Sequence, residues 1–580
     1  MNFYALRRLW FYIISLSFLS LGLASAQESL SIDQRIDGLL EPVAVWTDKI
    51  VFYSVPVFGQ GLPIVLVLLA FTGVFLTIYF GFINFRAFGL ALRTVRGKYS
   101  TADDPGQITH FQALSTALSA TVGLGNIAGV AVAISIGGPG AVFWMVVMGL
   151  LGMTSKFAEC TLGVAYRDID GNGRVHGGAM RYLEKGLKEK GFGKLGKGLA
   201  IFFAIACVGG ALGAGNMFQM NQSAEQVTEV FGIFGDGQGW ILGVIVAFMV
   251  GAVIIGGIVS IARVTAILVP FMTIIYVIAC VVVLAGYMPQ IPEALMTIVR
   301  EAFSMEAGIG GLVGGVIQGI KRGVFSNEAG LGSAAIAHAP VKTRRPASEG
   351  VVALLEPFID TVVICLMTSL VIVTTGIWTV DANVNRTATL REAPNSEAAV
   401  VVEMTDRDLV HVVEAGEEWY EVQLKDGMGD GFVESDAVTE RGGWSGGIWL
   451  TSRSFGTVIP WFPYVLAVAV FLFAFSTMIS WSYYGEQAVY YLFGGSKAVI
   501  LGYKFIFCVC IVFGAASSLK NVLMLSDAMY FAMVAPNLIG IYFLLPRIRL
   551  ELSRFMDFAK NVDSGDSLDV AEAKAKASEN

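Results

Sequence analysis

Long apolar runs recur along this 580-residue chain, and they constrain its fold more than any other feature. A helix needs about 20 apolar residues to cross the hydrocarbon core of a bilayer, and an isolated strand or loop would leave backbone polar groups unpaired there. Only 15% of the residues are charged, against about 25% in soluble domains. The chain is therefore expected to be an all-α polytopic membrane protein, which excludes a soluble enzyme and a nucleic-acid binder.

The sequence predicts eleven membrane spans. They are expected at residues 62–84, 111–136, 140–165, 198–231, 239–261, 264–287, 308–337, 351–378, 458–483, 498–516 and 521–545.

Residues 1–26 have the pattern of a secretory signal peptide. Arg7 and Arg8 precede an apolar stretch from Leu9 to Leu23, and small residues at Ala24-Ser25-Ala26 follow it, which is the order of a cleavable leader. An uncleaved anchor helix is the alternative. Either interpretation places residue 27 outside the cytoplasm.

Lys and Arg collect in alternate loops. The basic loop residues are Arg86, Arg93, Arg96 and Lys98, then those from Arg167 to Lys197, then Lys342, Arg344 and Arg345, and finally Arg547, Arg549 and Arg554. Because cytoplasmic loops carry the excess of Lys and Arg, the N-terminus is expected outside and the C-terminus in the cytoplasm. An odd number of spans agrees with that orientation.

Residues 381–442 differ from the rest of the chain. They hold 15 acidic and 5 basic residues, a net charge of −10 in a chain whose total is −7. Short runs with period-two alternation, such as 419–424 and 431–433, are separated by glycine-containing turns. Such runs predict strands of a small β-barrel, inserted after the eighth span and hence on the outer side. The chain is thus divided into a leader (1–26), a first membrane part (27–380), the insert (381–442), a second membrane part (443–550) and a cytoplasmic tail (551–580).

Two spans contain glycine-rich interruptions, Ser119-Ala-Thr-Val-Gly-Leu-Gly-Asn126 and Gly319-Ile-Lys-Arg-Gly-Val-Phe-Ser-Asn-Glu-Ala-Gly-Leu-Gly332. Glycine weakens a helix interior, and a helix that opens in a bilayer exposes N–H and C=O groups that bind ions or charged substrates. The interruptions lie five spans apart on helices of opposite direction, as in an inverted repeat with a site between its halves. The alternative is close helix packing, with Asn126 as an interhelical hydrogen-bonding group.

Four blocks of sequence resemble the alanine-or-glycine:cation symporter family. They are the run from Gln112 to Arg167 with Ala-Thr-Val-Gly-Leu-Gly-Asn-Ile-Ala-Gly-Val, Gly215-Asn-Met-Phe-Gln219, Gly323-Val-Phe-Ser-Asn-Glu-Ala-Gly330 and Ser480-Trp-Ser-Tyr-Tyr-Gly-Glu-Gln487. The resemblance covers about residues 60–550 without the insert. It implies the leucine-transporter fold, a 5+5 inverted repeat of ten core spans, here with one extra N-terminal span. Residues 390–438 resemble a bacterial SH3-type domain, a departure from the family pattern in an external loop.

The resemblance also implies a substrate site for a small neutral amino acid. Backbone N–H groups near Leu124 and Gly125 are expected to hold the carboxylate, and carbonyls around Ala120 and Phe325 the ammonium. Thr121, Gly123 and Ser326 are also expected at the substrate site. Asn126 is a substrate or sodium contact. Gln219 is expected to reach the substrate, with Gln222 as the alternative. Thr477 and Trp481 share a helix face, where the indole either roofs the pocket or serves as a packing aromatic.

Sodium is the expected coupling ion, and no other cofactor is expected. The carbonyls of Ser119 and Val122, with the hydroxyl of Ser476 or Thr477, match the ion site of the fold by resemblance.

Charged residues within spans are costly and are usually paired or functional. Asp360, four residues after Glu356, is expected either at a second cation site or in a pair with Lys or Arg near the inner mouth. Lys156 and Glu159 are expected to pair with each other. Arg322, next to Lys321, and Asp527 are expected to form an outer gate or a static ion pair.

The sequence therefore predicts a sodium symporter of alanine or glycine in a bacterial inner membrane. No hydrolase or kinase pattern is present, and the chain is not expected to be an enzyme. A membrane receptor that senses through the insert is the alternative, and a channel lacks the expected rings of pore charges. The insert is expected to bind a cell-wall or envelope partner, or else to act as a spacer or lid.

Overall fold

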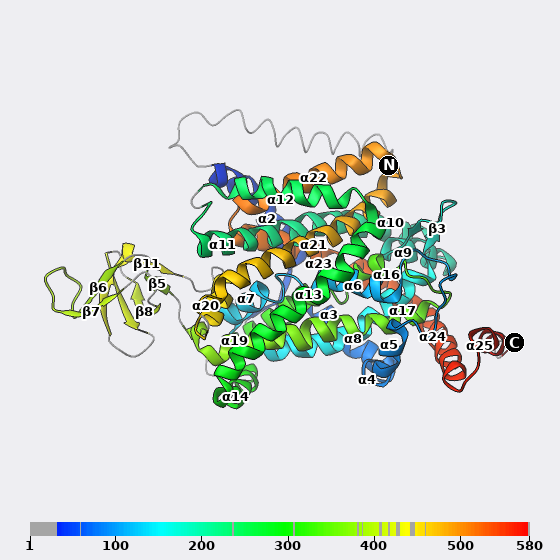
Figure 1. Ribbon diagram of the computed structural model, residues 1–580, viewed down its shortest axis with the longest axis horizontal. Coiled ribbons are helices and arrows are strands. Elements are labelled where there is room, and N and C mark those ends of the chain that lie inside the picture. Colours follow the sequence, from blue (N-terminus) through cyan, green and yellow to red (C-terminus); the bar gives the residue numbers. More distant parts are fainter. Residues whose placement is uncertain are drawn as a thin grey trace.

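Helices make up the body of the molecule and run mostly along its long axis (Figure 1). The computed structural model describes residues 32–57, 60–234, 237–304, 308–379, 382–384, 387–404, 409–415, 418–424, 430–440, 447–458 and 460–577. The leader predicted at residues 1–26 lies outside these residues.

The helices of the first membrane part begin before the first predicted span. They are α2 (Ile32–Val51), α3 (Ile64–Tyr79), α4 (Ile83–Arg86), α5 (Phe88–Val95), α6 (His110–Thr121), α7 (Ala128–Gly137), α8 (Gly140–Ala165), α9 (Ala179–Glu189), α10 (Gly193–Leu212), α11 (Phe218–Phe231), α12 (Gly239–Ile254), α13 (Gly257–Gly286), α14 (Ile291–Ala302), α15 (Gly308–Asn327), α16 (Ala334–His338), α17 (Pro346–Ala353), α18 (Leu355–Pro357) and α19 (Leu366–Thr375).

The second membrane part consists of α20 (Gly447–Gly456), α21 (Phe462–Phe493), α22 (Lys497–Ala516), α23 (Leu519–Ala532), α24 (Val534–Asp563) and α25 (Leu568–Ala577). Two π-helical segments, Gly213–Met217 and Phe358–Cys365, continue α10 into α11 and α18 into α19. Two short hairpins, β1–β2 (Ser54–Val57, Gln60–Pro63) and β3–β4 (Asp168–Ile169, Val175–His176), lie in loops.

Every predicted span contains a helix. Seven helical segments of the described residues are long and apolar enough to cross a membrane. Three more predicted spans coincide with the shorter apolar helices α3, α7 and α12, and α15 fills most of the span predicted at 308–337. The turn between α12 and α13 falls at residues 255–256 and not at the predicted 262–263, because Gly257 adopts a positive φ of 68°.

The side of the bundle formed by α12, α13 and α22 is apolar. Phe248, Ile255, Ile267 and Phe505 are 69–81% exposed there. A large exposed apolar surface marks contact with a membrane or a protein partner, and the span predictions indicate the former.

The basic loops and the insert lie at opposite ends of the bundle (Figure 1). Helices α4, α5 and α9 and the last turns of α24 gather at one end, where α25 also lies. The insert projects from the other end beside α20. This separation is what the loop charges predict if one end faces the cytoplasm.

Helix α2 was not predicted, because Asp33, Arg35, Asp37 and Glu41 interrupt its apolar residues. It packs against α23 and α22. Asp37 Oδ1 accepts hydrogen bonds from the Ser518 N–H and hydroxyl at 2.8 and 2.9 Å. Residues 32–51, which precede the first predicted span, are therefore part of the folded bundle.

The insert is an antiparallel sheet and not the predicted barrel. Its strands are β5 (Ala382–Val384), β6 (Ala388–Arg391), β7 (Val400–Met404), β8 (Leu409–Ala415), β9 (Trp419–Leu424), β10 (Asp430–Glu434) and β11 (Val438–Glu440). The order is β11-β5-β8-β9-β10-β6-β7. A barrel closes only when the first and last strands of the order pair. Among the described residues β11 pairs only with β5 and β7 only with β6, so the sheet is open.

The insert has its own apolar core, in which Leu390, Val410, Val422 and Val433 are fully buried. The chain enters it through β5 and leaves through β11, and these two strands are antiparallel neighbours, with Val384 opposite Val438. The connection to the helices is therefore narrow.

We predict that the helical bundle folds without the insert. Replacing residues 385–437 by Asn-Gly joins two strand ends that are already opposite each other with a turn suited to hairpins. The thermal unfolding of the helices, followed by circular dichroism, should then be unchanged. A bundle that no longer inserts or melts cooperatively would show that the sheet supports the helices.

Candidate functional site

The first broken helix opens at residues 122–127, between α6 and α7. Two of its N–H groups are held by side-chain oxygens. The N–H of Gly123 donates to Asn126 Oδ1 at 2.9 Å, and the N–H of Leu124 donates to Gln219 Oε1 at 3.1 Å. The N–H of Gly125 has no partner among the described residues. The run therefore has one N–H that is unpaired within the described part of the chain and two that are paired with neutral side chains. That it holds a carboxylate stays a prediction.

The second broken helix opens at residues 328–333, between α15 and α16. Glu328, Gly330 and Gly332 have positive φ angles of 58°, 90° and 83°. Helix α15 packs against α7, and α16 against α6. The two broken helices thus run antiparallel with their breaks at the same level, and both predicted interruptions are confirmed.

Gln219 and Thr477 close the first break from one side. A Cβ atom on Gly123 would lie 2.5 Å from Thr477 Oγ1 and 3.1 Å from Gln219 Oε1. Gly123 is thus required by close approach and not only by helix opening. Gln219 follows the π-helical segment on α11, and its Nε2 donates to the Ala214 carbonyl at 3.0 Å.

Phe325 and Ser326 close the first break from the side of α15. A Cβ atom on Gly125 would lie 3.4 Å from Ser326 Cα and 3.6 Å from Phe325 Cδ1. Ala120 and Thr121 lie in the last turn of α6, where the Thr121 hydroxyl donates to the Ala117 carbonyl at 3.2 Å. All of these side chains are at most 4% exposed, so a ligand reaches the site only if the surrounding helices move.

Trp481 lies beside the second break. Its Nε1 donates to Glu328 Oε1 at 2.9 Å, and its ring lies 5.0 Å from that of Tyr530, which stacks on Phe325 at 5.1 Å. A Cβ atom on Gly215 would fall 2.2 Å from Trp481 Cγ, so the indole packs directly on the π-helical segment. Phe325, Tyr530 and Trp481 form a continuous aromatic group.

Glu328 and Tyr530 were missed by sequence reasoning. Glu328 Oε2 also accepts from the Ser333 hydroxyl at 2.5 Å, which ties the two sides of the second break together. The signal was available, because an acidic residue inside a span is costly and rarely idle. Tyr530 carries no such signal, since its position follows from helix packing alone.

The residues predicted to bind sodium lie where α6 meets α21. The Thr477 hydroxyl donates to the Ser119 carbonyl at 3.0 Å, and the Ser119 hydroxyl donates to the Ser476 carbonyl at 2.8 Å. The Ser476 hydroxyl instead donates to the Phe473 carbonyl of its own helix at 2.9 Å. Val122 is the first residue after α6. Of the two candidate hydroxyls, the geometry therefore favours that of Thr477.

Asp360 joins the two breaks. Asn126 Nδ2 donates to its Oδ1 at 2.6 Å, and the hydroxyls of Ser326 and Thr361 donate to its Oδ2 at 2.7 Å. The predicted pair with Lys or Arg is wrong among the described residues. Asp360 lies in the π-helical segment 358–365, whose wider turn breaks the face that it was expected to share with Glu356.

One other intramembrane prediction is also corrected. Lys156 does not pair with Glu159 on its own helix but donates to Glu356 Oε1 on α18 at 2.9 Å. Glu159 Oε1 accepts instead from Asn537 Nδ2 at 2.8 Å. The physical reason is burial, since fully buried charges require direct partners across the bundle.

The remaining candidates lie away from the breaks. Lys321 Nζ lies 2.9 Å from Asp527 Oδ2, and Arg322 bonds the same oxygen, so the predicted ion pair is present. Gln222, the alternative to Gln219, does not reach the first break. Its Oε1 accepts from the Ile448 N–H at 2.8 Å, which fixes α20 to α11.

The sequence profile of the family described as "Sodium:alanine symporter family" matches residues 47–405 and 433–569. The chain belongs to this family. Its members are transporters and not enzymes, as predicted. The match is interrupted within the insert, whose SH3-type resemblance remains a prediction.

Two relatives of this chain have names that describe transporters of alanine. The sodium/alanine symporter AgcS of Methanococcus maripaludis is 39% identical over 501 residues, 86% of this chain and 95% of that protein. The putative sodium/proton-dependent alanine carrier protein YrbD of Bacillus subtilis is 30% identical, over 80% of this chain and 84% of that protein. A crystal structure of MhsT with L-phenylalanine aligns at 14% identity and a TM-score of 0.44, covering 77% of this chain and 99% of that one.

We predict that Gly123→Ala damages the site of this symporter, whereas Gly129→Ala does not. The added methyl group at Gly123 would displace the Thr477 hydroxyl from the Ser119 carbonyl, and overpacking costs about 1–3 kcal/mol. At Gly129 the nearest atom would be the Leu124 carbonyl oxygen at 3.8 Å, an ordinary contact. The midpoint temperature of thermal unfolding in detergent and the affinity for alanine should both fall in Gly123→Ala but not in Gly129→Ala. Equal behaviour of the two variants would contradict the packing argument.

Proposed function

We propose that this protein carries alanine or glycine into the cell together with sodium, by alternating access of one buried site. The two opposed helix breaks are the observation that supports it. Their backbone N–H groups lie at the same level of the bundle, and those of Gly123, Leu124 and Ala329 are bonded to neutral side-chain oxygens. A substrate carboxylate would replace Gln219 Oε1 at the N–H of Leu124 and also accept from that of Gly125.

The same geometry accounts for a small substrate. The space beside residues 123–125 is limited by Gln219 and Thr477 on one side and by Phe325 on the other. We assign the ammonium to carbonyls at the ends of α6 and α15, near Ala120 and Phe325, because helix C-termini attract cations. The aromatic group of Phe325, Tyr530 and Trp481 excludes a long side chain.

We assign the sodium ion to oxygens between α6 and α21. Sodium replaces its water shell with carbonyl and hydroxyl oxygens. The Thr477 hydroxyl contacts the Ser119 carbonyl, and the Ser476 carbonyl contacts the Ser119 hydroxyl, so these oxygens gather between the two helices. The Val122 carbonyl completes the proposed set. Asp360, which contacts both broken helices through Asn126 and Ser326, is proposed to hold the halves in register.

The proposed architecture is a leucine-transporter-type 5+5 repeat, from α6 to α24, with α3 outside it. The basic end of the bundle is assigned to the cytoplasm of a bacterial inner membrane. This orientation places the C-terminus inside and residues 381–442 outside, where the insert would meet a cell-wall or envelope partner.

Uptake into proteoliposomes tests both the transport and the ion site. Alanine uptake should rise steeply with an inward sodium gradient and should not respond to potassium. Thr477→Val, which keeps the shape but removes the hydroxyl, should raise the sodium concentration for half-maximal uptake about tenfold or more, since a hydrogen bond to a charged group contributes about 1.5–3 kcal/mol. Ser476→Ala should change it little, because its carbonyl remains.

Uptake that ignores the sodium gradient would remove the symport proposal. If Ser476→Ala proved the more damaging variant, the ligand assignment would be reversed while symport would stand.

Trp481 is predicted to limit substrate size. Trp481→Ala should admit leucine and weaken alanine binding, since filling an apolar cavity contributes about 25 cal/mol per Å² of buried area. Trp481→Phe is the matched control, because it keeps a ring but removes the hydrogen bond to Glu328. It should weaken alanine uptake without admitting leucine, as measured by competition in the same vesicles. An unchanged substrate profile in Trp481→Ala would show that the indole does not limit the pocket.

A further inference from the structure

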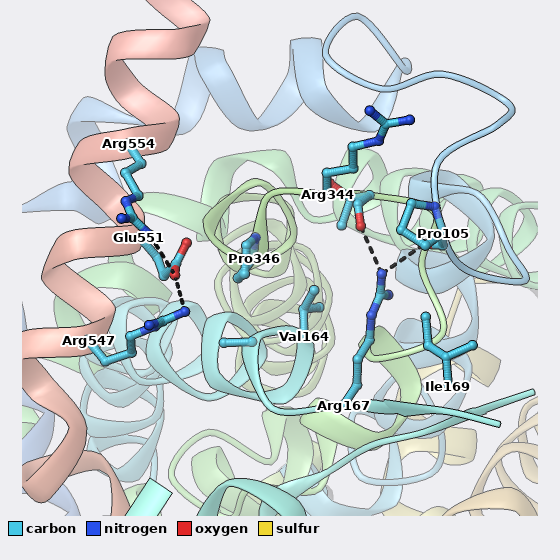
Figure 2. A pocket seen from close by; sticks show the side chains of 11 residues that line it. Pro105, Val164, Arg167, Ile169, Arg344, Pro346, Arg547, Glu551 and Arg554 are labelled. Atoms are coloured by element: carbon cyan, nitrogen blue, oxygen red, sulfur yellow. Dashed lines mark hydrogen bonds and ion pairs between the residues drawn. The ribbon is translucent and has the colours of Figure 1, made fainter. Parts of the chain in front are cut away.

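A pocket of about 500 Å³ lies at the basic end of the bundle, away from the helix breaks. Figure 2 shows two facing walls, one formed by α24 with Arg547, Glu551 and Arg554, and the other carrying Arg167 and Arg344. Four arginines and one glutamate line the pocket, so the lining has a net charge of +3. Pro346, at the start of α17, lies between the walls.

Arg167 supplies a positive charge that has no ion pair among the described residues, and Glu349 acts on it only from beyond salt-bridge distance. Its guanidinium donates to the carbonyls of Ala339 and Val341 at 2.6 Å, and to those of Pro105 and Thr343 at 2.7 and 2.8 Å. No carboxylate of the described residues lies within salt-bridge distance of it. Burial lowers the pKa of Arg167 to about 10, so the group stays protonated at neutral pH. The charge is fixed in place by four backbone oxygens.

The α24 wall holds two more guanidinium groups around one acid. Glu551 Oε1 lies 2.7 Å from Arg547 Nη2 and 3.7 Å from Arg554 Nη1, and all three residues line the pocket. The Nε of Arg547 is buried and has no hydrogen-bond partner among the described residues. A buried donor without a partner is costly, and an anion in the pocket would satisfy it.

The cationic side chains of this pocket are all arginines, whereas lysines are frequent elsewhere at the basic end of the bundle. The guanidinium group presents paired donors in a plane and binds phosphate oxygens two at a time, which the ammonium of lysine cannot do. A general excess of basic residues on the cytoplasmic side accounts for neither this choice nor the two facing walls.

We propose that this pocket binds a phosphate-bearing anion between α24 and the loop before α17. Arg547 and Arg554 hold the phosphate from one wall. Arg344 approaches it from the other wall with the guanidinium donors left by its ion pair with Asp104, whose Oδ1 lies 3.1 Å from Nε. Arg167 adds to the positive electrostatic potential of the pocket, and its hydrogen bonds hold together the loops that line the pocket. The phosphate comes either from an anionic lipid headgroup or from a soluble phosphate, since both carry the same oxygens.

Thermal unfolding of the purified full-length protein tests the proposal. One arm compares phosphatidylcholine nanodiscs with and without phosphatidylglycerol, and the other titrates inorganic phosphate against chloride at matched ionic strength in neutral detergent. A shift with phosphatidylglycerol alone assigns the site to a lipid headgroup, and a shift with inorganic phosphate assigns it to a soluble phosphate. No shift in either arm would overturn the proposal.

Substitutions of the pocket arginines test where the phosphate binds. Arg547→Gln combined with Arg554→Gln should weaken binding about tenfold or more, because each variant removes charged hydrogen bonds. Arg549→Gln is the matched control. It removes the same charge from the same helix, but its guanidinium lies over the Tyr79 ring at 5.9 Å, outside the pocket. Arg344→Gln, at a largely exposed side chain of the other wall, should also weaken binding, and it serves if the double variant does not fold. Equal loss in Arg549→Gln would show general attraction to a basic surface and overturn the proposal.

Discussion

Backbone hydrogen bonding inside a bilayer is the constraint on which the rest of this structure depends. Two helices open there, and the hydrocarbon offers no water to pair the exposed groups. The bundle responds with side chains, of which Asn126, Gln219 and Asn327 each supply an amide oxygen to a backbone N–H at a break. These polar groups are neutral, so a charged ligand that displaces them gains stronger hydrogen bonds than it breaks. A binding site is therefore the natural use of such an opening.

Buried charges connect the same helices from within. Lys156 on α8 pairs with Glu356 on α18, whose other oxygen lies 3.6 Å from His338 Nε2 at the end of α16. His338 and His110 both contact Glu349 on α17. These side chains thus form a continuous set of contacts from the first turn of α6 to α8. Removing one member of a buried pair leaves its partner buried without a counterpart, which is costly. These contacts therefore hold both broken helices against α8 and α17.

The sequence predicted the parts of this structure that have a local signal. Glycine runs at 119–126 and 319–332 predicted both breaks, and apolar length predicted the spans. The family resemblance identified Gln219, Thr477 and Trp481 as candidate site residues. In the fold, Gln219 and Thr477 lie at the first break and Trp481 lies beside the second. Contacts between distant helices could not be predicted in this way. The partners of Asp360 depend on the π-helical segment at 358–365, for which the sequence holds no recognised signal, and the partner of Lys156 depends on which helices meet across the bundle. The barrel prediction failed because period-two alternation does not specify whether a sheet closes.

The narrow connection through β5 and β11 has a consequence for the history of the chain. A segment whose two ends are paired neighbours is gained or lost by a single genetic insertion or deletion, with no change required in the helices on either side. The family profile is interrupted between residues 405 and 433, inside this segment, while it continues through the helices before and after. The sheet is therefore free to diverge, or to be exchanged for another domain, at a rate set by its own selection rather than by that on the transport site.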